Sequence, residues 1–365
     1  MSEAEKFVMK AASAFDTDGA PTSFERCNAG HINDTFFIFC GKEEPSYILQ
    51  RVNTSIFKDP ESLMANIWGV CEHLRKKVIA EGGDPDREVR KIILTKNGDK
   101  YYIDEEGGYW RAYLCLNGVL CLNEATKETF YKSALAFGHF FCQLADYPAE
   151  TLAETIPNFH NSVSRYNDFK AAVESDPLGR ADECRDLIEF ALSKKDKCSY
   201  ILDRIKSGEM KLCVTHNDTK LNNVLLDEKT YDGVCVIDLD TVMPGSILYD
   251  FGDSIRFGAS SAREDEADLD KVYIDLDMFE TYVDGFLKEL RPTMTEAEVL
   301  GLPMGAYLMT YETGVRFLGD YLTGDTYFKT HYPGQNLVRA KNQLKLIADM
   351  DAKMPLMDAI VRKYL

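Results

Sequence analysis

The chain has 365 residues, of which 45% are hydrophobic and 28% are charged, a composition typical of globular domains with sizeable cores. Its formal net charge of −18 excludes nucleic acid as an expected partner, because such a surface needs a basic stripe that displaces counterions. No apolar run approaches the roughly 20 residues of a membrane span, and the acidic segment 1–10 does not resemble a secretory signal. We therefore expect a cytoplasmic protein with no membrane partner.

The first third of the chain has the pattern of a sheet. β-branched and aromatic residues gather in short runs between Gly, Asn, Asp and Pro, which predicts strands at 35–40, 47–53, 91–95, 100–104 and 109–116. One helix is expected among them, because Asp59 and Pro60 provide a start, apolar residues recur at helical spacing, and Gly82 with Gly83 provides an end. The pattern predicts an antiparallel sheet with one helix packed on it.

Beyond residue 123 the pattern becomes mainly helical. Apolar residues at helical spacing predict helices at 124–145, 184–206, 277–290, 308–321 and 336–351. Apolar runs at 211–215, 224–227 and 234–238 predict a short β insert within this part. We therefore expect an α+β fold, with a β-rich, nucleotide-binding lobe at residues 1–117 and a larger, mainly helical lobe at 118–365 that carries catalysis and the substrate.

The β insert carries the residues that point to chemistry. The segment 216–223 reads HNDTKLNN, an H-x-D-x-K-x-x-N pattern, and the next apolar run leads directly to Asp238. Phosphoryl transfer needs a carboxylate that holds and deprotonates the attacking hydroxyl, and oxygen ligands for the metal that neutralises the phosphates. The spacing predicts Asp218 as the base, Asn223 and Asp238 as Mg²⁺ ligands, and Lys220 as a cation for the γ-phosphoryl oxygens. The structural alternative is a polar turn between two strands.

Three neighbouring residues are assigned supporting roles. His216 is expected to brace the loop from the core side by bonding a backbone carbonyl. Asp250 begins the sequence DFG, which spells the metal-binding triplet of protein kinases, but it follows a turn and starts a helix, so we expect it to brace a loop. Asp240 lies on the same side of an extended chain as Asp238 and is predicted to add a second metal oxygen or to face the substrate.

The nucleotide side of the site has weaker signals. The loop 28–35 contains one glycine, and Gln50 stands where protein kinases carry the lysine that pairs with the α- and β-phosphates. We therefore assign phosphate anchoring to Arg51, the loop amides or the metal. From the expected fold, adenine should dock against backbone groups between residues 113 and 117, with Leu114 and Leu116 as the binding residues.

Together these motifs resemble one known family. The segment 216–223, followed by VIDLDTVMPGS at 236–246, is similar to the aminoglycoside phosphotransferase superfamily, and within it to the N-acetylhexosamine 1-kinases. The likeness extends to GHIN at 30–33, YILQ at 47–50 and RFL at 316–318, and covers most of the chain. The resemblance implies a bilobal protein-kinase-like fold, ATP as phosphoryl donor, Mg²⁺, and phosphorylation of the anomeric C1 hydroxyl of GlcNAc or GalNAc.

The resemblance also implies the sugar-binding residues His31, Thr241, Phe257, Arg316 and Tyr327. A neutral amino sugar is held by hydrogen bonds to its hydroxyl and N-acetyl groups and by an aromatic platform against its C–H face, which Arg316, Phe257 and Tyr327 are able to supply. The structural alternatives are a core position for Phe257, a surface loop for Tyr327 and an ion pair on its own helix for Arg316.

Two other functions remain open from the sequence. One is a kinase for a cationic substrate such as an aminoglycoside or choline, which calls for a carboxylate cluster or an aromatic cage; the acidic run 264–268 has the pattern of a solvated helix start instead. The other is a pseudokinase that keeps the fold as a binding module, and its mark would be loss of the base or of a metal ligand. The expected partners are a sugar and a nucleotide, and the sequence does not indicate the oligomeric state.

Overall fold

The structure, a computed structural model, describes residues 3–27 and 32–365 and divides the chain into two compact units. The first unit comprises Met1–Cys121, Thr151–Ile156 and Val224–Met243, and the second comprises Leu122–Glu150, Pro157–Asn223 and Pro244–Leu365. The first is built around a sheet and the second is mainly helical, which confirms the predicted α+β class. The functional lobes with a boundary at residue 117 stay a prediction.

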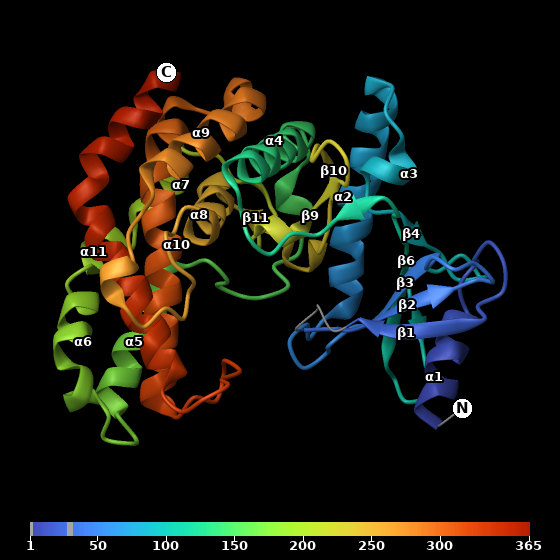
Figure 1. The fold of residues 1–365 in the computed structure, drawn as a ribbon, viewed down its shortest axis with the longest axis horizontal. Helices are drawn as coiled ribbons and strands as arrows, with labels where there is room; N and C mark the ends of the chain where they lie inside the picture. Colours follow the sequence, from blue (N-terminus) through green and yellow to red (C-terminus); the bar gives the residue numbers. More distant parts are fainter. Residues whose placement is uncertain (1–2, 28–31) are drawn as a thin grey trace. The chain divides into compact units, whose positions relative to one another are not determined.

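The sheet of the first unit has six antiparallel strands in the order β1-β2-β3-β6-β4, with β5 paired to β6. Figure 1 shows β1, β2 and β3 side by side. The bounds are Ser23–Cys27 (β1), Asp34–Phe39 (β2), Tyr47–Arg51 (β3), Ile92–Ile93 (β4), Tyr102–Ile103 (β5) and Tyr109–Leu114 (β6). The five predicted strands are present, and β1 is the strand that the sequence reasoning missed.

One face of this sheet carries an apolar core. The helix α1 (Glu3–Ala12) packs there, and the cluster includes Val8, Ala11, Phe15, Leu49 and Trp110. Successive residues of a strand point to opposite faces, so Gln50 and Arg111 point away from α1. The sheet therefore has an apolar face against α1 and a second face that carries polar groups.

The predicted helix of the first unit is α2 (Pro60–Glu81). The Asp59 carboxylate caps its start by accepting from the Ser62 amide at 3.0 Å, and Gly82, with a φ of 82°, ends it in the left-handed conformation. The remaining elements are α3 (Pro85–Glu88), the three-stranded sheet β10-β9-β7, and the 3₁₀ turn η5 (Leu239–Thr241). These strands span Val119–Leu120 (β7), Val224–Asp227 (β9) and Gly233–Val236 (β10).

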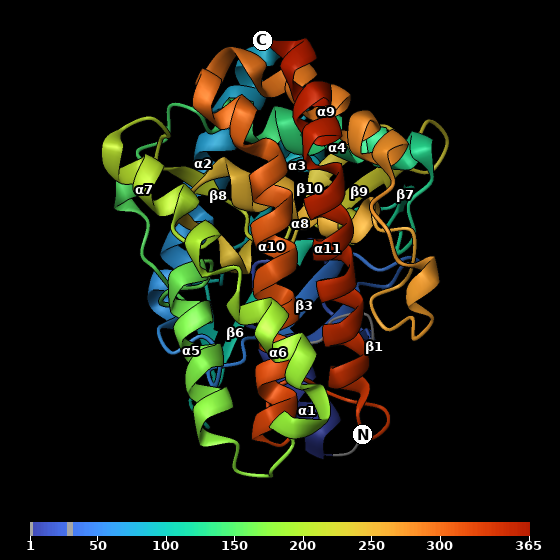
Figure 2. The same ribbon diagram turned by 90° about the vertical axis from the view of Figure 1, so that its left-hand side faces the viewer.

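The second unit is a helical bundle. Figure 2 shows its two longest helices, α10 and α11, side by side, and α5 packs against α10. The helices span Lys127–Gln143 (α4), Ser162–Ser175 (α5), Arg185–Leu192 (α6), Tyr200–Ser207 (α7), Ile247–Gly258 (α8), Leu276–Leu290 (α9), Glu296–Thr323 (α10) and Gln335–Val361 (α11). The short strand β8 (Cys213–Thr215) pairs with β11 (Met243–Gly245), whose last two residues open the final segment of this unit.

Two helix predictions were wrong in their bounds. The region 184–206 forms two short helices separated by the 3₁₀ turn Lys195–Lys197. The helix α10 begins at Glu296, well before the predicted start, because Thr295 and Glu298 form a capping box there. It also contains Pro303. Proline in a helix interior costs about 3 kcal/mol, and here the packing of a largely buried helix outweighs that cost.

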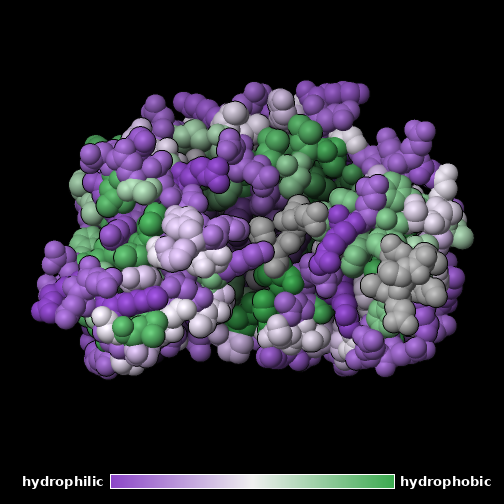
Figure 3. Space-filling view, turned by 60° about the horizontal axis from the view of Figure 1, so that its bottom comes forward, coloured by the Kyte–Doolittle hydropathy of each residue, from purple (hydrophilic) through white to green (hydrophobic). Residues whose placement is uncertain are grey.

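The described surface has the character expected from the composition. In the face shown in Figure 3, hydrophilic residues cover most of the surface and apolar residues form smaller patches between them. Within the ranges 3–27 and 32–365, no helix is long and apolar enough to span a bilayer.

Candidate active site

The segment that carries Asp218 is a loop held in an uncommon backbone conformation. It follows β8, and Asn217 adopts a φ of 64°, in the left-handed region that asparagine tolerates better than most residues. The buried carboxylate of Asp250 accepts from the amide of Asn217 at 2.6 Å and from that of His216 at 3.1 Å. The prediction that Asp250 braces a loop is therefore confirmed.

Two further contacts fix the same loop to helices of the second unit. His160 lies between Glu312, 3.1 Å from its Nδ1, and the backbone carbonyl of Asn217, 3.3 Å from its Nε2. The Thr219 hydroxyl donates to the backbone carbonyl of Asp250. Sequence reasoning missed His160 and Glu312, because their partners are far away along the chain and no local pattern marks them.

His216 braces the loop from the core, as predicted. Its side chain is fully buried, and the rings of Phe137 and Phe140 meet it edge-on with centroids 5.7 and 6.2 Å away. Its Nδ1 accepts from the amide of Asp218 at 3.3 Å. An accepting Nδ1 requires the neutral imidazole with the proton on Nε2. The predicted bond from His216 to a backbone carbonyl stays a prediction.

The braced loop brings Asp218, Lys220 and Asn223 together. Lys220 Nζ lies 2.6 Å from Asp218 Oδ1, and Asn223 Nδ2 donates to Asp218 Oδ2 at 3.0 Å and to its backbone carbonyl at 2.7 Å. Burial raises the pKa of the Asp218 carboxyl, but the Lys220 ammonium and the hydrogen bonds outweigh it, so the pKa lies below the ordinary value of 3.8. Asp218 is therefore an anion at neutral pH.

Lys220 is held in its charged form by two carboxylates. Burial lowers its pKa, but Asp218 and Asp253 outweigh that effect and raise it. Asp253 Oδ1 accepts from Nε and Nη2 of Arg256 at 3.2 Å each. Its Oδ2 is buried and has no hydrogen-bond partner among the described residues. Sequence reasoning assigned nothing to Asp253, which lies one helical turn after Asp250.

The predicted metal ligands offer oxygen atoms of the kind that Mg²⁺ prefers. Asn223 uses its Nδ2 for Asp218, and no donor of the described chain reaches its Oδ1. Asp238 lies two residues after the end of β10, at the start of η5 in the first unit, with an exposed side chain and a left-handed backbone, φ 60° and ψ 57°. In residues 3–27 and 32–365 there is no group of three or more His, Cys, Asp or Glu side chains placed to hold a metal. Mg²⁺ keeps several waters and few protein ligands, so oxygen donors of this kind suit it, and the roles of Asn223 and Asp238 as its ligands stay predictions.

Asp240 is engaged in a buried ion pair. Arg111 Nη2 lies 2.6 Å from Asp240 Oδ1 and 2.8 Å from Oδ2, and Asn33 Nδ2 donates to Oδ2 at 2.7 Å. The Oδ1 atom receives no well-directed hydrogen bond from the described residues. The role of Asp240 as a metal ligand stays a prediction, and Oδ1 is the oxygen it would use.

The position of the expected phosphate-binding lysine is filled by a glutamine that faces an arginine. Gln50 Oε1 accepts from Nε and Nη2 of Arg111, its register partner on β6, at 3.0 and 2.8 Å. Arg51 points to the other face of the sheet, with Nη2 3.9 Å from Asp104 and 3.6 Å from Glu106. Phosphate anchoring by Arg51 stays a prediction, and this placement does not favour it. The missed signal was an arginine amid the apolar residues of a buried strand.

The two predicted adenine-binding residues differ in their free backbone groups. The amide of Leu114 donates to the Lys91 carbonyl at 3.0 Å, and its carbonyl accepts from Arg90 at 3.3 Å. Leu116 is partly exposed, and no hydrogen bond of its amide or carbonyl occurs among the described residues. Leu116 is therefore the residue of the pair with backbone groups available to a purine.

The predicted sugar-binding residues fall into three groups. Arg316 and Tyr327 meet in the second unit, where Arg316 Nη2 lies 3.1 Å from the Tyr327 hydroxyl. Phe257 is half-buried on α8 of the same unit, and Thr241 is buried in η5 of the first unit. His31 lies outside the described residues.

Arg316 and Tyr327 line a pocket of about 290 Å³. The Asp320 carboxylate shapes this pocket, because it accepts from the amides of Tyr327 and Phe328 at 2.8 and 2.9 Å. The guanidinium of Arg316 also lies over the Phe328 ring, 5.2 Å from its centroid. Arg316 therefore contacts Tyr327 and Phe328, which lie beyond its own helix, and not only an acid on that helix.

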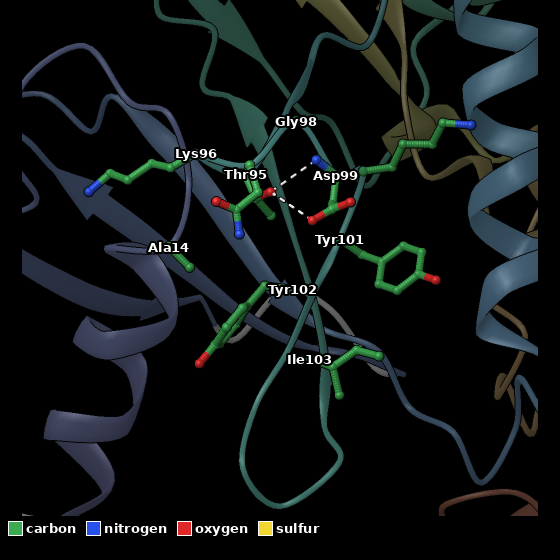
Figure 4. A pocket seen from close by; sticks show the side chains of 10 residues that line it. Ala14, Thr95, Lys96, Gly98, Asp99, Tyr101, Tyr102 and Ile103 are labelled. Atoms are coloured by element: carbon green, nitrogen blue, oxygen red, sulfur yellow. Dashed lines mark hydrogen bonds between the residues drawn. The ribbon is translucent and has the colours of Figure 1, made fainter.

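A second pocket, of about 710 Å³, lies in the first unit and contains no predicted site residue. Figure 4 shows that it is formed by the segment 95–103, with Ala14 at its side and the hydroxyl of Thr95 accepting the amide of Asp99 at 3.0 Å. No catalytic constellation faces it, so we assign it no part in the site.

Comparison with known proteins gives one family and several similar folds. The model of the phosphotransferase enzyme family matches residues 23–277. Among solved structures, a microcompartment-associated aminopropanol kinase is 16% identical with a TM-score of 0.57, covering 97% of this chain and 98% of that chain. A choline kinase from Cryptosporidium parvum Iowa II is 11% identical with a TM-score of 0.58, covering 99% of each. A spectinomycin phosphotransferase in complex with ADP and spectinomycin is 13% identical with a TM-score of 0.55, covering 95% of this chain and 98% of that chain. These likenesses confirm the predicted kinase-like fold.

Proposed function

Because this chain belongs to the phosphotransferase enzyme family, we propose that it transfers the γ-phosphoryl group of ATP to the anomeric C1 hydroxyl of an N-acetylhexosamine, GlcNAc or GalNAc. The observation that carries the proposal is the braced loop in which Asp218 contacts both Lys220 and Asn223. A pseudokinase is disfavoured, because the base and both predicted metal ligands are retained. The partners are then small molecules, and the proposed location is the cytoplasm.

In the proposed reaction, Asp218 orients the C1 hydroxyl and accepts its proton. A bond forms between the C1 oxygen and the γ-phosphorus as the bond from that phosphorus to the β–γ bridging oxygen breaks, which gives the sugar 1-phosphate and ADP. A carboxylate with a lowered pKa is a weak base, and this suits a loose transition state in which the proton leaves late. Lys220, which pairs with Asp218 here, would turn to the γ-phosphoryl oxygens as their charge is redistributed.

Asn223 and Asp238 are proposed to hold Mg²⁺ through their side-chain oxygens, and Asp240 is proposed to add Oδ1. When bound, the metal offsets the charge of the phosphates and so favours attack on them. This matters in a chain with a net charge of −18, which by itself would repel a nucleotide.

The nucleotide is proposed to dock along the end of β6. Leu116 offers its free amide and carbonyl to the purine, and Leu114 lends an apolar side chain. Phosphate contacts by Arg51 would require its side chain to leave Asp104 and Glu106. ADP in the spectinomycin phosphotransferase supports an adenine nucleotide as the donor.

The acceptor is proposed to bind where Arg316 and Tyr327 meet, with Phe257 as a platform and His31 and Thr241 as hydrogen-bonding groups. The aminopropanol, choline and spectinomycin kinases suggest an amine-bearing substrate as the alternative. Arg165 and Arg316 line the pocket together with Asp168 and Asp320, and this balance of charges, with no excess of carboxylates, suits the hydroxyl and N-acetyl groups of a neutral sugar.

Replacing Tyr327 by alanine is expected to raise the KM for the sugar about tenfold, because one hydrogen-bonding group and one aromatic face are lost, and about 1.4 kcal/mol corresponds to a factor of ten. The KM for ATP should stay the same. Tyr332→Ala is the control, since Tyr332 is also exposed but lies outside this pocket. Equal sugar KM values in wild type and Tyr327→Ala would remove Tyr327 from the acceptor site.

Nuclear magnetic resonance of the product tests the proposed chemistry. With Mg-ATP and ¹³C-labelled GlcNAc or GalNAc, the proposal predicts a phosphorus coupling at C1. A phosphorylated product without phosphorus coupling at C1 would keep the kinase and overturn the anomeric assignment. If neither sugar is phosphorylated, the substrate class is wrong.

A further inference from the structure

The proposed reaction gives no role to Arg111, a buried charge of the first unit. Arg111 lies in the middle of β6 with 1% of its surface exposed, on the sheet face that also carries Gln50. A buried guanidinium is costly unless it is paired and hydrogen-bonded. Sequence patterns for a strand do not require an arginine at this position, so its contacts should explain its presence.

Those contacts connect the sheet to the metal-binding segment. Gln50 receives Nε and Nη2 of Arg111 at 3.0 and 2.8 Å, and Asp240 receives Nη2 at 2.8 Å. The Gln50 amide in turn donates to the Thr35 hydroxyl at 3.1 Å, which fixes the side-chain oxygen toward the arginine. Arg111 therefore joins β3 and β6 to η5, all within the first unit.

Asp240 follows the proposed ligand Asp238 by two positions, in the single 3₁₀ turn that Asp238 begins. A left-handed backbone at a residue other than glycine persists only where its surroundings fix it. Here Arg111 and Asn33 hold the Asp240 carboxylate, and Asn66 Nδ2 donates to the carbonyl of Val242 at 3.0 Å. Side chains of three residues from other parts of the first unit therefore fix the turn after Asp238.

We propose that Arg111 is a positioning residue, which holds Asp240 and through it sets the backbone and carboxylate of the metal ligand Asp238, with Gln50 aiming the guanidinium. This inference rests on the proposed function for the metal-binding role of Asp238. It also accounts for Gln50. In protein kinases the strand lysine at this position reaches the phosphates and pairs with a helix glutamate. Here the strand residue is a neutral acceptor, and the cation stands on the neighbouring strand, turned toward the metal segment.

Direct contact between Arg111 and a phosphate is a different role, and the burial of Arg111 argues against it. With 1% of its surface exposed and its Nε and Nη2 engaged, the side chain presents no face to a ligand. Outer-sphere residues that orient a ligand typically change metal affinity or activity by about 10- to 100-fold when they are replaced.

Arg111→Lys tests the proposal, because it keeps the positive charge but loses the planar fork that serves Gln50 and Asp240 together. We expect Mn²⁺, used as a spectroscopic probe in place of Mg²⁺, to bind about tenfold more weakly at saturating ADP, as measured by electron paramagnetic resonance. Arg90→Lys is the matched control, since Arg90 is also a buried arginine of the first unit, just before β4, but its guanidinium donates to the Leu114 carbonyl and not to Gln50 or Asp240. It should leave the Mn²⁺ affinity unchanged.

Hydrogen exchange of the ligand-free protein provides a second readout. In Arg111→Lys the amides of 238–242 should exchange at least tenfold faster than in wild type or Arg90→Lys. Gln50→Leu should show a smaller effect in the same direction, and Gln50→Glu, which keeps the acceptor oxygens, should restore slow exchange. A purely structural ion pair would lower the melting temperature and leave both readouts unchanged, which overturns the proposal.

The two claims are separable. If wild type binds no Mn²⁺ with ADP and turns over no acceptor, the proposed function fails. Hydrogen exchange at 238–242 still decides whether Arg111 fixes the turn. If wild type binds Mn²⁺ and the lysine variant binds it equally well, the positioning role fails and the function stands.

Discussion

Replacing Asp218 by asparagine is expected to lower kcat about a thousandfold, with little change in the KM for ATP. The substitution is nearly isosteric and keeps an oxygen for Asn223, but it removes the group that accepts the proton of the attacking hydroxyl. Proton transfer by a positioned side chain contributes about 10²- to 10⁴-fold. Steady-state kinetics with the N-acetylhexosamine that wild type uses best would measure the effect.

The role of Asp218 as the base also predicts how kcat/KM depends on pH. Because the pKa of Asp218 lies below the ordinary 3.8, the base stays ionised from neutral pH down to that value, and kcat/KM should show no Asp218-dependent fall above about pH 5. Asp203→Asn, an exposed change on α7, is the control and should behave as wild type. An Asp218→Asn variant that retains more than a tenth of wild-type kcat would refute the assignment of the base.

Asp250→Ala is expected to lower the free energy of unfolding by about 2–5 kcal/mol and to abolish turnover. It leaves the amides of His216 and Asn217 buried without an acceptor, and each buried unsatisfied group costs about 1–3 kcal/mol. The left-handed backbone of Asn217 loses its brace at the same time. Urea denaturation followed by circular dichroism would measure the loss.

The destabilisation should depend on pH. Burial raises the pKa of Asp250 well above 3.8, and the nearby carboxylates of Asp253 and Asp218 act in the same direction against its two amide donors. A raised folded-state pKa gives stability that is fully present below the unfolded pKa and is lost as pH rises through the folded value. The difference in the free energy of unfolding between wild type and Asp250→Ala should therefore be larger at pH 4 than at pH 7. If this difference in the free energy of unfolding instead increased toward neutral pH, Asp250 would be buried as an anion.

The contacts that could be predicted from the sequence are local ones, and the catalytic roles of Asp218, Lys220 and Asn223 stay predictions. The pattern H-x-D-x-K-x-x-N fixes Asp218, Lys220 and Asn223 within one turn of chain, so its spacing already implied that they meet. The role of Asp250 followed from its place at the start of a helix, where a buried strand end would have been needed for metal binding. Context within a few residues was sufficient in both cases.

The residues missed by sequence reasoning act over long distances. Arg111 reaches Asp240, and His160 reaches Glu312, across contacts that no periodicity encodes. The helix α10 begins at Glu296, before the predicted start at 308, and it contains Pro303, a residue that usually ends or kinks a helix and that is tolerated here by the surrounding packing. Register, burial and ion pairing between distant strands come from the tertiary fold, which local propensity does not specify.

ADP release with Mg-ATP across GlcNAc, GalNAc, glucose, galactose, choline and kanamycin tests the central claim most directly. We predict Mg²⁺-dependent ADP formation that requires an N-acetylated hexose and is lost in Asp218→Asn. Turnover on choline or kanamycin alone would keep the phosphotransferase and contradict the sugar assignment. ADP formation that does not respond to any of these acceptors would contradict the account of the substrate.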